Sequence, residues 1–199
     1  MKARNLPLQP LALAIALALP AAAQAATVID LSVAQARSRA SNSTPSLQAL
    51  TGAQAGDLKV LRSVTLPNGK TVTRYQQYFQ GVPVWGEAIV EEVDNKTRNL
   101  SGSHSRSGRY LADIQQDLAS ARPALSAQQV LAQAKSLKAA GRATRNDKAE
   151  LVVQLGNNNV AQLVYLVSFF VGGKAPSRPH FVIDANDGTV LQQLSLIHI

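Results

Sequence analysis

The side chains that could do chemistry are few and far apart. The sequence has no cysteine, and its three histidines are His104, His180 and His198. No two of them lie four residues apart, so the His-Glu-x-x-His pattern that holds zinc on a helix is absent. A structural zinc site would have to combine carboxylates with these scattered imidazoles. We therefore expect no metal and no other cofactor on this chain, and we expect His104 and His180 to be ordinary surface residues.

Nucleophilic and acid–base catalysis are also poorly supported. The stretch "SGSHSRSG" places serines beside His104, but sequence neighbours rarely form a triad, which also needs an orienting acid. The chain has no Gly-x-Ser-x-Gly elbow and no phosphate-binding glycine loop. Glu87, Glu91 and Glu92 could supply paired carboxylates. Charged residues on the exposed face of a strand are the more frequent explanation, so the sequence predicts no catalytic residue.

The first residues have the composition of a cleaved leader. Lys2 and Arg4 precede the apolar run "LALAIALALP", and Ala23 and Ala25 are small residues at the spacing that a signal peptidase recognises. The alternative is a membrane anchor, but the apolar run of ~15 residues is shorter than the ~20 that span a bilayer. Residues 1–25 are thus predicted to be a signal peptide cleaved before Ala26. The product is expected to be exported, with no membrane partner.

The charge balance raises nucleic acid as a possible partner. The formal net charge is +8, of which Lys2 and Arg4 supply two, leaving +6 for the remainder. The basic residues are dispersed and form no recognition motif, and export separates the chain from the nucleoid. We expect no nucleic acid as partner. Solvated surface charge, or attraction to an acidic protein, remain open explanations.

Periodicity predicts an antiparallel β-meander over 58–112. Residues 26–57 are expected to be a loosely ordered lead-in, in which Ser32 caps a short helix. Alternating apolar residues over 58–66 lead to Asn68-Gly69, which we expect to form a tight turn with positive φ at both positions. A return strand over 71–79, a turn bracketed by Gly81 and Pro83, and a strand over 85–93 follow. Residues 99–108 are expected to be a loop.

The second half predicts a helix packed on an antiparallel sheet. After a linker over 113–123, Ser126 and Gln129 form a capping-box pair, and Gly141 ends the helix. Strands follow within 124–193; in one of them Ala161 and every second residue through Val171 form an unbroken apolar face. The chain is therefore expected to be an α+β protein of two small domains.

Aromatic residues gather around one turn. Tyr75, Tyr78, Phe79 and Trp85 flank the sequence Gly-Val-Pro-Val. Core packing is the commonest fate of such residues in a small sheet. Docking on a partner is the alternative, and the two explanations are compatible.

Two stretches resemble known propeptide modules. "LPNGKTVTRYQQYFQGVPVWGEAIV" is similar to the fungalysin/thermolysin propeptide (FTP) domain, whose motif falls here on Arg74, Tyr75, Gln77, Tyr78, Gly81, Val82, Pro83, Val84, Trp85 and Gly86. "SAQQVLAQAKSL" through "SRPHFVIDANDGTVL" resembles the cystatin-like PepSY domain, whose ending falls on His180, Val182, Asp184 and Gly188.

The order signal peptide, FTP, PepSY resembles the prepropeptide of thermolysin-like secreted zinc metalloproteases, in particular the pseudolysin (elastase) and vibriolysin group. The resemblance implies an intramolecular chaperone and temporary inhibitor whose partner is the cognate protease domain. It also implies a route through the periplasm to the extracellular space. Zinc, and calcium, would belong to the protease domain, which we expect to be missing from this chain.

Residues 194–199 are expected to be non-native. The sequence "LSLIHI" is what one transposon end used in sequencing-library preparation encodes, which suggests a truncated gene. Two alternatives remain open at this point. The chain could be a stand-alone exported protein that inhibits a protease in trans, or the metalloendopeptidase activity of a full-length precursor could be assigned to it.

Overall fold

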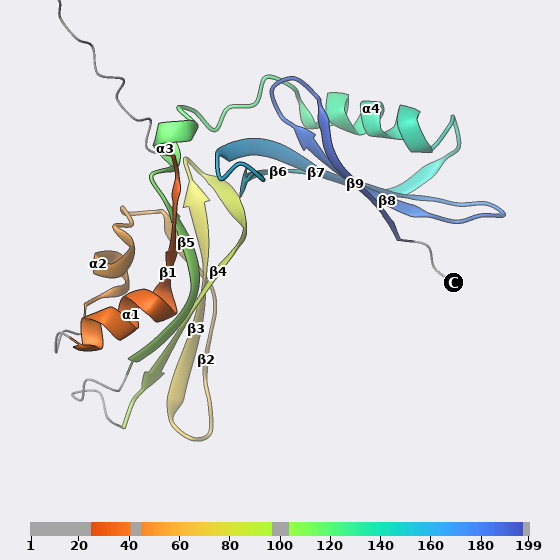
Figure 1. Cartoon of the computed structure of the whole chain (residues 1–199). Coiled ribbons are helices and arrows are strands. Elements are labelled where there is room, and N and C mark those ends of the chain that lie inside the picture. Colours follow the sequence, from red (N-terminus) through yellow and green to blue (C-terminus); the bar gives the residue numbers. More distant parts are fainter. Residues whose placement is uncertain (1–24, 41–44, 97–103, 197–199) are drawn as a thin grey trace, which may run out of the picture.

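A computed structural model describes residues 25–40, 45–96 and 104–196. Its strands form a nine-stranded sheet that bends into two layers, each with helices on one face (Figure 1). The elements, in chain order, are β1 (Thr27–Asp30), α1 (Leu31–Ala40), α2 (Leu47–Thr51), β2 (Leu58–Thr65), β3 (Lys70–Phe79), β4 (Val82–Asp94), β5 (His104–Ala112), α3 (Ile114–Asp117), α4 (Ala127–Lys138), β6 (Thr144–Leu155), β7 (Ala161–Val171), β8 (Arg178–Asp184) and β9 (Val190–Leu196).

The first layer contains the predicted meander, with different turns. β2, β3, β4 and β5 pair antiparallel in chain order. In the first turn only Gly69 has positive φ (88°), and Asn68 instead accepts a hydrogen bond from the Lys70 amide at 3.1 Å through its side chain. The second turn is Gln80-Gly81, with φ of 48° and 87°. This two-residue turn pairs Phe79 with Val82, so β4 begins earlier than predicted.

The segment expected to be a loosely ordered lead-in is regular structure. β1 pairs with β5, and α1 packs on the same strand. Asp30, not Ser32, caps α1: its carboxylate accepts from the amides of Ser32 and Val33 at 2.9 and 3.1 Å. The helix shows weak amphipathicity because one of its two buried residues is Gln35. The Gln35 amide donates to the His104 carbonyl at 2.6 Å, a polar contact that hydrophobic periodicity does not register.

β5 replaces much of the predicted loop. Of residues 99–108, those from His104 onward form a strand that pairs with both β1 and β4. Composition misled the prediction here, because this strand buries Arg106 where an apolar residue is usual. Residues 99–103 lie outside the described residues.

The second layer is the predicted helix on a sheet. α4 begins with the Ser126–Gln129 capping box and ends before Ala140 and Gly141, which have φ of 49° and 77°. β6 to β9 pair antiparallel in order. The apolar face of β7 is buried against α4, and the residues that form it are Ala161, Leu163, Tyr165, Val167, Phe169 and Val171.

The two layers are joined through a shared core, which the prediction of two small domains did not include. β4 pairs parallel with β6 at Val84 and Val153, and both residues are buried. The stretch 113–123, expected to be a linker, contains α3 and the buried Ile114 and Ala121. The Gln80 side chain accepts from the Ala121 amide at 3.0 Å. The α+β class is confirmed, and the segment between the layers is packed structure.

Candidate protein-docking groove

Among the residues that the structure describes, no helix covers one face of the second layer. Arg178, His180 and Val182 alternate along β8 and point away from α4, because Phe181 and Ile183, at the other positions of the alternation, lie in the core. The register places His180 beside Ser168 of β7 and Leu194 of β9. It places Val182 beside Leu166. Figure 1 shows α4 on the outer side of the bend, so the uncovered face is turned toward the inner side.

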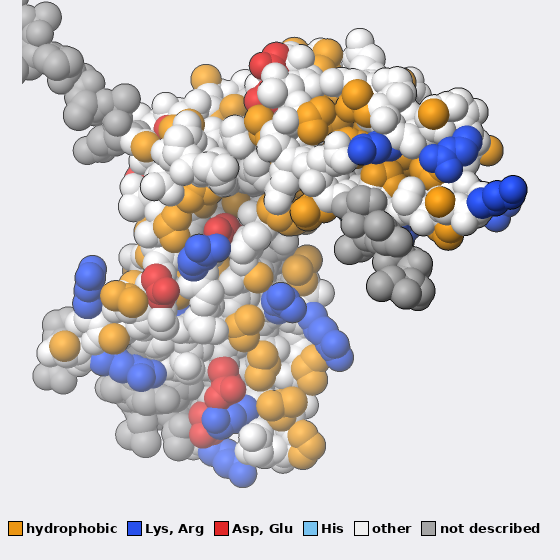
Figure 2. All heavy atoms as spheres, turned by 45° about the vertical axis from the view of Figure 1, so that its right-hand side comes forward, with side chains coloured by type: hydrophobic (Ala, Val, Ile, Leu, Met, Phe, Trp, Pro, Cys, Tyr) orange, Lys and Arg blue, Asp and Glu red, His pale blue; other side chains and the backbone are white. Residues whose placement is uncertain are grey.

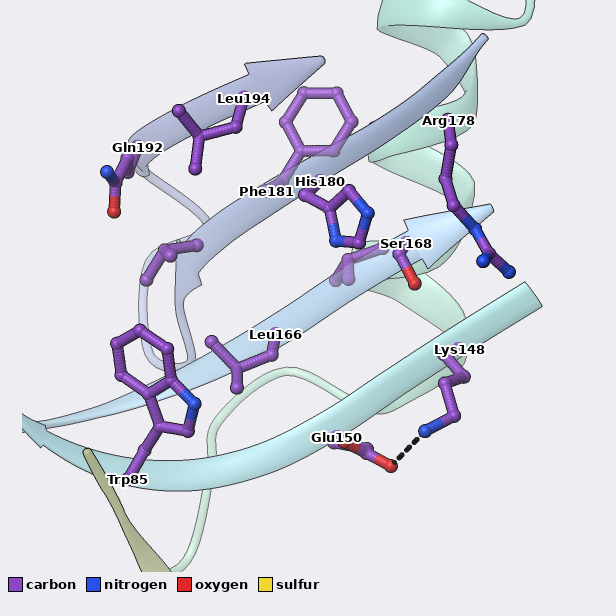
Figure 3. A pocket seen from close by; sticks show the side chains of 12 residues that line it. Trp85, Lys148, Glu150, Leu166, Ser168, Arg178, His180, Phe181, Gln192 and Leu194 are labelled. Carbon is purple, nitrogen blue, oxygen red and sulfur yellow. Dashed lines mark hydrogen bonds and ion pairs between the residues drawn. The ribbon is translucent and has the colours of Figure 1, made fainter. Parts of the chain in front are cut away.

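This face is hollowed into a groove of about 550 Å³ (Figure 3). Its lining residues come from β4 and from all four strands of the second layer; they are Trp85, Lys148, Glu150, Leu166, Val167, Ser168, Arg178, His180, Phe181, Val182, Gln192 and Leu194. Trp85 is 51% exposed; Leu194, the first residue of the stretch expected to be non-native, is 57% exposed. Exposed large apolar groups of this kind typically mark an interaction site.

The groove has a basic end opposite Trp85 (Figure 3). Arg178 Nε and His180 Nε2 are buried there, and neither has a hydrogen-bond partner among the residues that the structure describes. Lys148 lies nearby and donates to Glu150 at 2.8 Å. Buried donors normally meet an acceptor, so this end is suited to a carboxylate. A segment with apolar side chains and one acidic group would match the whole groove.

The residues of the predicted FTP motif fall into structural and exposed groups. Gln77 is 2% exposed, and its amide donates to the Leu111 carbonyl at 2.7 Å and accepts from the Leu111 amide at 2.9 Å. Val84 lies in the shared core. Val82 and Pro83 are half-buried, and Gly81 forms the turn. Trp85, beside Gly86 with φ of 84°, is the motif residue that reaches the groove.

The aromatic cluster divides in the same way. Tyr75 is half-buried in the core of the first layer and donates to Glu91 at 3.1 Å. The Lys59 ammonium lies 4.2 Å from the centre of the Tyr78 ring. Phe79 packs against the shared core. Arg74 is exposed. Tyr75 and Phe79 thus pack against a core, Tyr78 contacts Lys59, and Trp85 is the exposed residue among these four aromatics.

Two residues of the PepSY motif build a turn and two line the groove. The Asp184 carboxylate accepts from the Asn186 amide at 2.7 Å. Gly188 has φ of 79°, and a Cβ there would lie 2.9 Å from Gln133 Oε1 of α4. His180 and Val182 line the groove. The structure thus brings His180 and Val182 together with Trp85, although nearly a hundred residues separate them along the chain.

Of the three glutamates expected on an exposed strand face, Glu87 is buried, and Glu91 and Glu92 are half-buried. Glu91 accepts from Arg106 Nε at 2.7 Å and lies 3.7 Å from His104 Nδ1, beneath α1. Glu87 is 7% exposed and pairs with Arg109 at 2.9 Å. Burial raises the pKa of Glu87, and the Arg109 guanidinium opposes that shift. His104 and His180 are partly buried, so the prediction of surface histidines was wrong.

Several residues that position the site escaped sequence analysis. Arg106 is 5% exposed and also donates to the Pro45 carbonyl at 2.9 Å. Asp117 accepts a hydrogen bond from the Ala161 amide, and Gln80 accepts one from the Ala121 amide. These two bonds hold the segment between the layers in place. These polar residues sit at positions that pattern analysis assigns to solvent, and no spacing signal marks them.

Metal-binding clusters and membrane-spanning helices are absent from the described residues. The described residues contain no cluster of three His, Asp or Glu side chains that could hold a metal ion. Within the same residues, no helix has the length and apolarity needed to cross a membrane. At the predicted leader cleavage site, Ala25 is exposed and Ala26 is buried, while Ala23 lies outside the described residues.

Comparison with known families matches part of the first layer, and the second layer, to propeptide modules. Residues 56–103 match the Fungalysin/Thermolysin Propeptide Motif, and residues 124–194 match the Peptidase propeptide and YPEB domain. The chain therefore carries propeptide modules of the kind found in metalloprotease precursors, and neither module is a catalytic peptidase domain.

Similar proteins include proteases of the genus Vibrio. The "Neutral protease" of Vibrio proteolyticus is 43% identical over 140 residues, which is 67% of this chain and 22% of that protein. The "Virulence metalloprotease" of Vibrio anguillarum is 40% identical over 142 residues, with the same shares. The chain thus spans about a fifth of the length of these relatives, within their propeptide region. Among solved structures, the Bacillus megaterium YpeB C-terminal domain aligns with 17% identity and a TM-score of 0.32, covering 72% of this chain and 58% of that one.

Proposed function

We propose that this chain is an intramolecular chaperone and temporary inhibitor for a zinc metalloendopeptidase domain made in the same precursor. The observation that carries the proposal is the groove on the uncovered sheet face, where Trp85 of the FTP module meets His180 and Val182 of the PepSY module. Zinc, and calcium, would be held by the protease domain. The chain would be exported to the periplasm and then leave the cell.

The groove supports this function through the shape and chemistry of what it can bind. A ligand that binds the folded or nearly folded protease better than the unfolded chain shifts the equilibrium toward the folded state. The apolar floor around Leu166 and Val182 would cover apolar surface of the partner, and Arg178 and His180 would hold an acidic group. Figure 2 shows Lys and Arg side chains spread over both parts of the molecule, which would favour an acidic partner.

The absence of disulfides suits a temporary partner. The sequence has no cysteine, so packing alone holds the fold, and no covalent crosslink protects it from proteolysis once it unfolds. We propose that the modules over 58–112 and 124–193 act together, because they share a core and both line the groove.

Inhibition of a related enzyme tests this function. The chain without its leader is titrated into the mature neutral protease of Vibrio proteolyticus while peptide hydrolysis is followed. The wild-type chain is expected to inhibit. Trp85→Ala is expected to weaken inhibition about tenfold or more, the size typical of a buried aromatic anchor in an interface.

Val60→Ala is the matched control, because Val60 is 58% exposed on β2 and lies outside the groove. It is expected to inhibit like the wild type. If the two folded variants inhibit equally well, the groove is not part of the interface with the protease. No inhibition by the wild-type chain would contradict the proposed function itself.

A further inference from the structure

The Asp117 carboxylate joins three parts of the chain at the junction of the two layers. Asp117 is the last residue of α3. Its Oδ2 atom accepts a hydrogen bond from the Ala161 amide of β7 at 2.7 Å and another from the Ala26 backbone nitrogen at 3.0 Å. One oxygen thus links the segment before β1, the helix between the layers and the second sheet.

Ala26 marks a sharp change from exposed to buried chain. Its exposed fraction is 8%, and its side chain lies in the shared core with Val84, Leu111 and Ile114. Ala25, the preceding residue, is exposed. The predicted leader cleavage falls between these two residues, at the point where the chain enters the core. Cleavage there would leave the fold's own packing intact.

We propose that Asp117 is the receptor for the α-ammonium that leader removal creates at Ala26. A signal peptidase adds water across the Ala25–Ala26 peptide bond; the new carboxylate leaves with Ala25, and the nitrogen stays on Ala26. An α-amino group has an ordinary pKa of about 7.7–8.0, so this nitrogen is protonated at neutral pH. It already lies within hydrogen-bonding distance of Asp117 Oδ2.

Cleavage thereby replaces an uncharged donor to the Asp117 carboxylate by a charged one, and the contact becomes an ion pair. In the uncleaved chain the donor to the Asp117 carboxylate is an uncharged peptide N–H. The ammonium adds the attraction between two opposite charges to the same contact. Because the same carboxylate oxygen holds β7 through Ala161, the new pair tightens the contact between the layers. The docking groove spans these layers, so its full rigidity is reached only after the leader has gone.

The test compares residues 26–199 with a free amino terminus and the same chain acetylated at Ala26. Acetylation keeps one N–H donor and removes the charge, as an uncleaved leader does. The free chain is expected to melt ~2–4 °C or more above the acetylated chain, since ~1 kcal/mol corresponds to that shift for a chain of this size. In Asp117→Asn the gap between the two forms should disappear.

Asp113→Asn is the matched control, because Asp113 is an exposed carboxylate at the start of the same helix with no side-chain capping bond. In this variant the free and acetylated chains should still differ in melting temperature by as much as in the wild type. The proposal is overturned if the free and acetylated wild-type chains melt at the same temperature. It is also overturned if the difference in melting temperature is unchanged in Asp117→Asn. If Asp117→Asn does not fold, the wild-type pair alone decides. Amino-terminal sequencing of the exported chain must also begin at Ala26, and any other start contradicts the assignment.

Discussion

At the scale of single residues, the molecule is held together by polar side chains in buried positions. Gln77 bonds both backbone groups of Leu111, and Arg106 is enclosed with Glu91 and the Pro45 carbonyl. Such groups are tolerated in a core only when their hydrogen bonds are made. Burial is inferred from apolar side chains at the level of the sequence, so no pattern marked Gln77 or Arg106 as buried. Asp117, which joins the two layers, was missed for the same reason.

Glu87 gives a pH-dependent prediction at this scale. Burial raises its pKa above the ordinary 4.5, so the folded state binds this proton more tightly than the unfolded state does. The free energy of unfolding then falls as the pH rises from about 4.5 through the pKa of Glu87 in the folded state. At neutral pH the protein still lacks the stability lost by ionising this buried carboxyl. Glu87→Gln removes this titration.

Urea unfolding of wild type and Glu87→Gln at several pH values between 4 and 7 measures the effect. The variant should gain stability relative to the wild type as the pH rises. If the free energies of unfolding of the two proteins change in parallel with pH, or if the variant loses stability relative to the wild type, burial of the Glu87 carboxylate does not destabilise the fold.

At the scale of elements, strong local signals were predicted correctly and elements held by tertiary contacts were not. The capping box of α4 and the apolar alternation of β7 lie in contiguous residues, and both are confirmed. β5 and α1 depend on each other: Gln35 of α1 bonds the backbone of β5 on both sides of Ser105. Neither has an apolar period of its own, so neither could be predicted from its own residues.

Gly108 shows how closely β5 approaches β4. Its φ is 101°, and a Cβ there would lie 1.9 Å from the Ala88 carbonyl oxygen. Gly108→Ala should therefore lower the free energy of unfolding by about 3 kcal/mol or more, combining backbone strain with a steric clash. Chemical denaturation measures the loss.

Gly56→Ala separates the two causes. Gly56 also has positive φ, 95°, but a Cβ there would meet nothing within 4 Å. It should cost only about 1–2 kcal/mol, the price of strain alone. Equal losses at the two glycines would mean that β5 can move away from β4.

At the scale of the whole molecule, the two propeptide modules share one core and one bent sheet. β4 belongs to both, because it pairs with β3 and β5 in the first layer and with β6 in the second. The sequence identified each module, and it left open whether the aromatic cluster around Trp85 packs in the core or docks on a partner. It could not predict the groove, because the groove depends on strand register and on the angle at which the layers meet (Figure 1).

Refolding of a denatured protease tests the central claim most directly. The mature neutral protease of Vibrio proteolyticus is diluted from denaturant with the wild-type chain, with the folded Trp85→Ala variant, or with an unrelated basic protein. The account predicts that the wild-type chain raises the yield of active enzyme, recovered once the chain has been degraded, well above the other two. A yield that is the same in all three mixtures would contradict it.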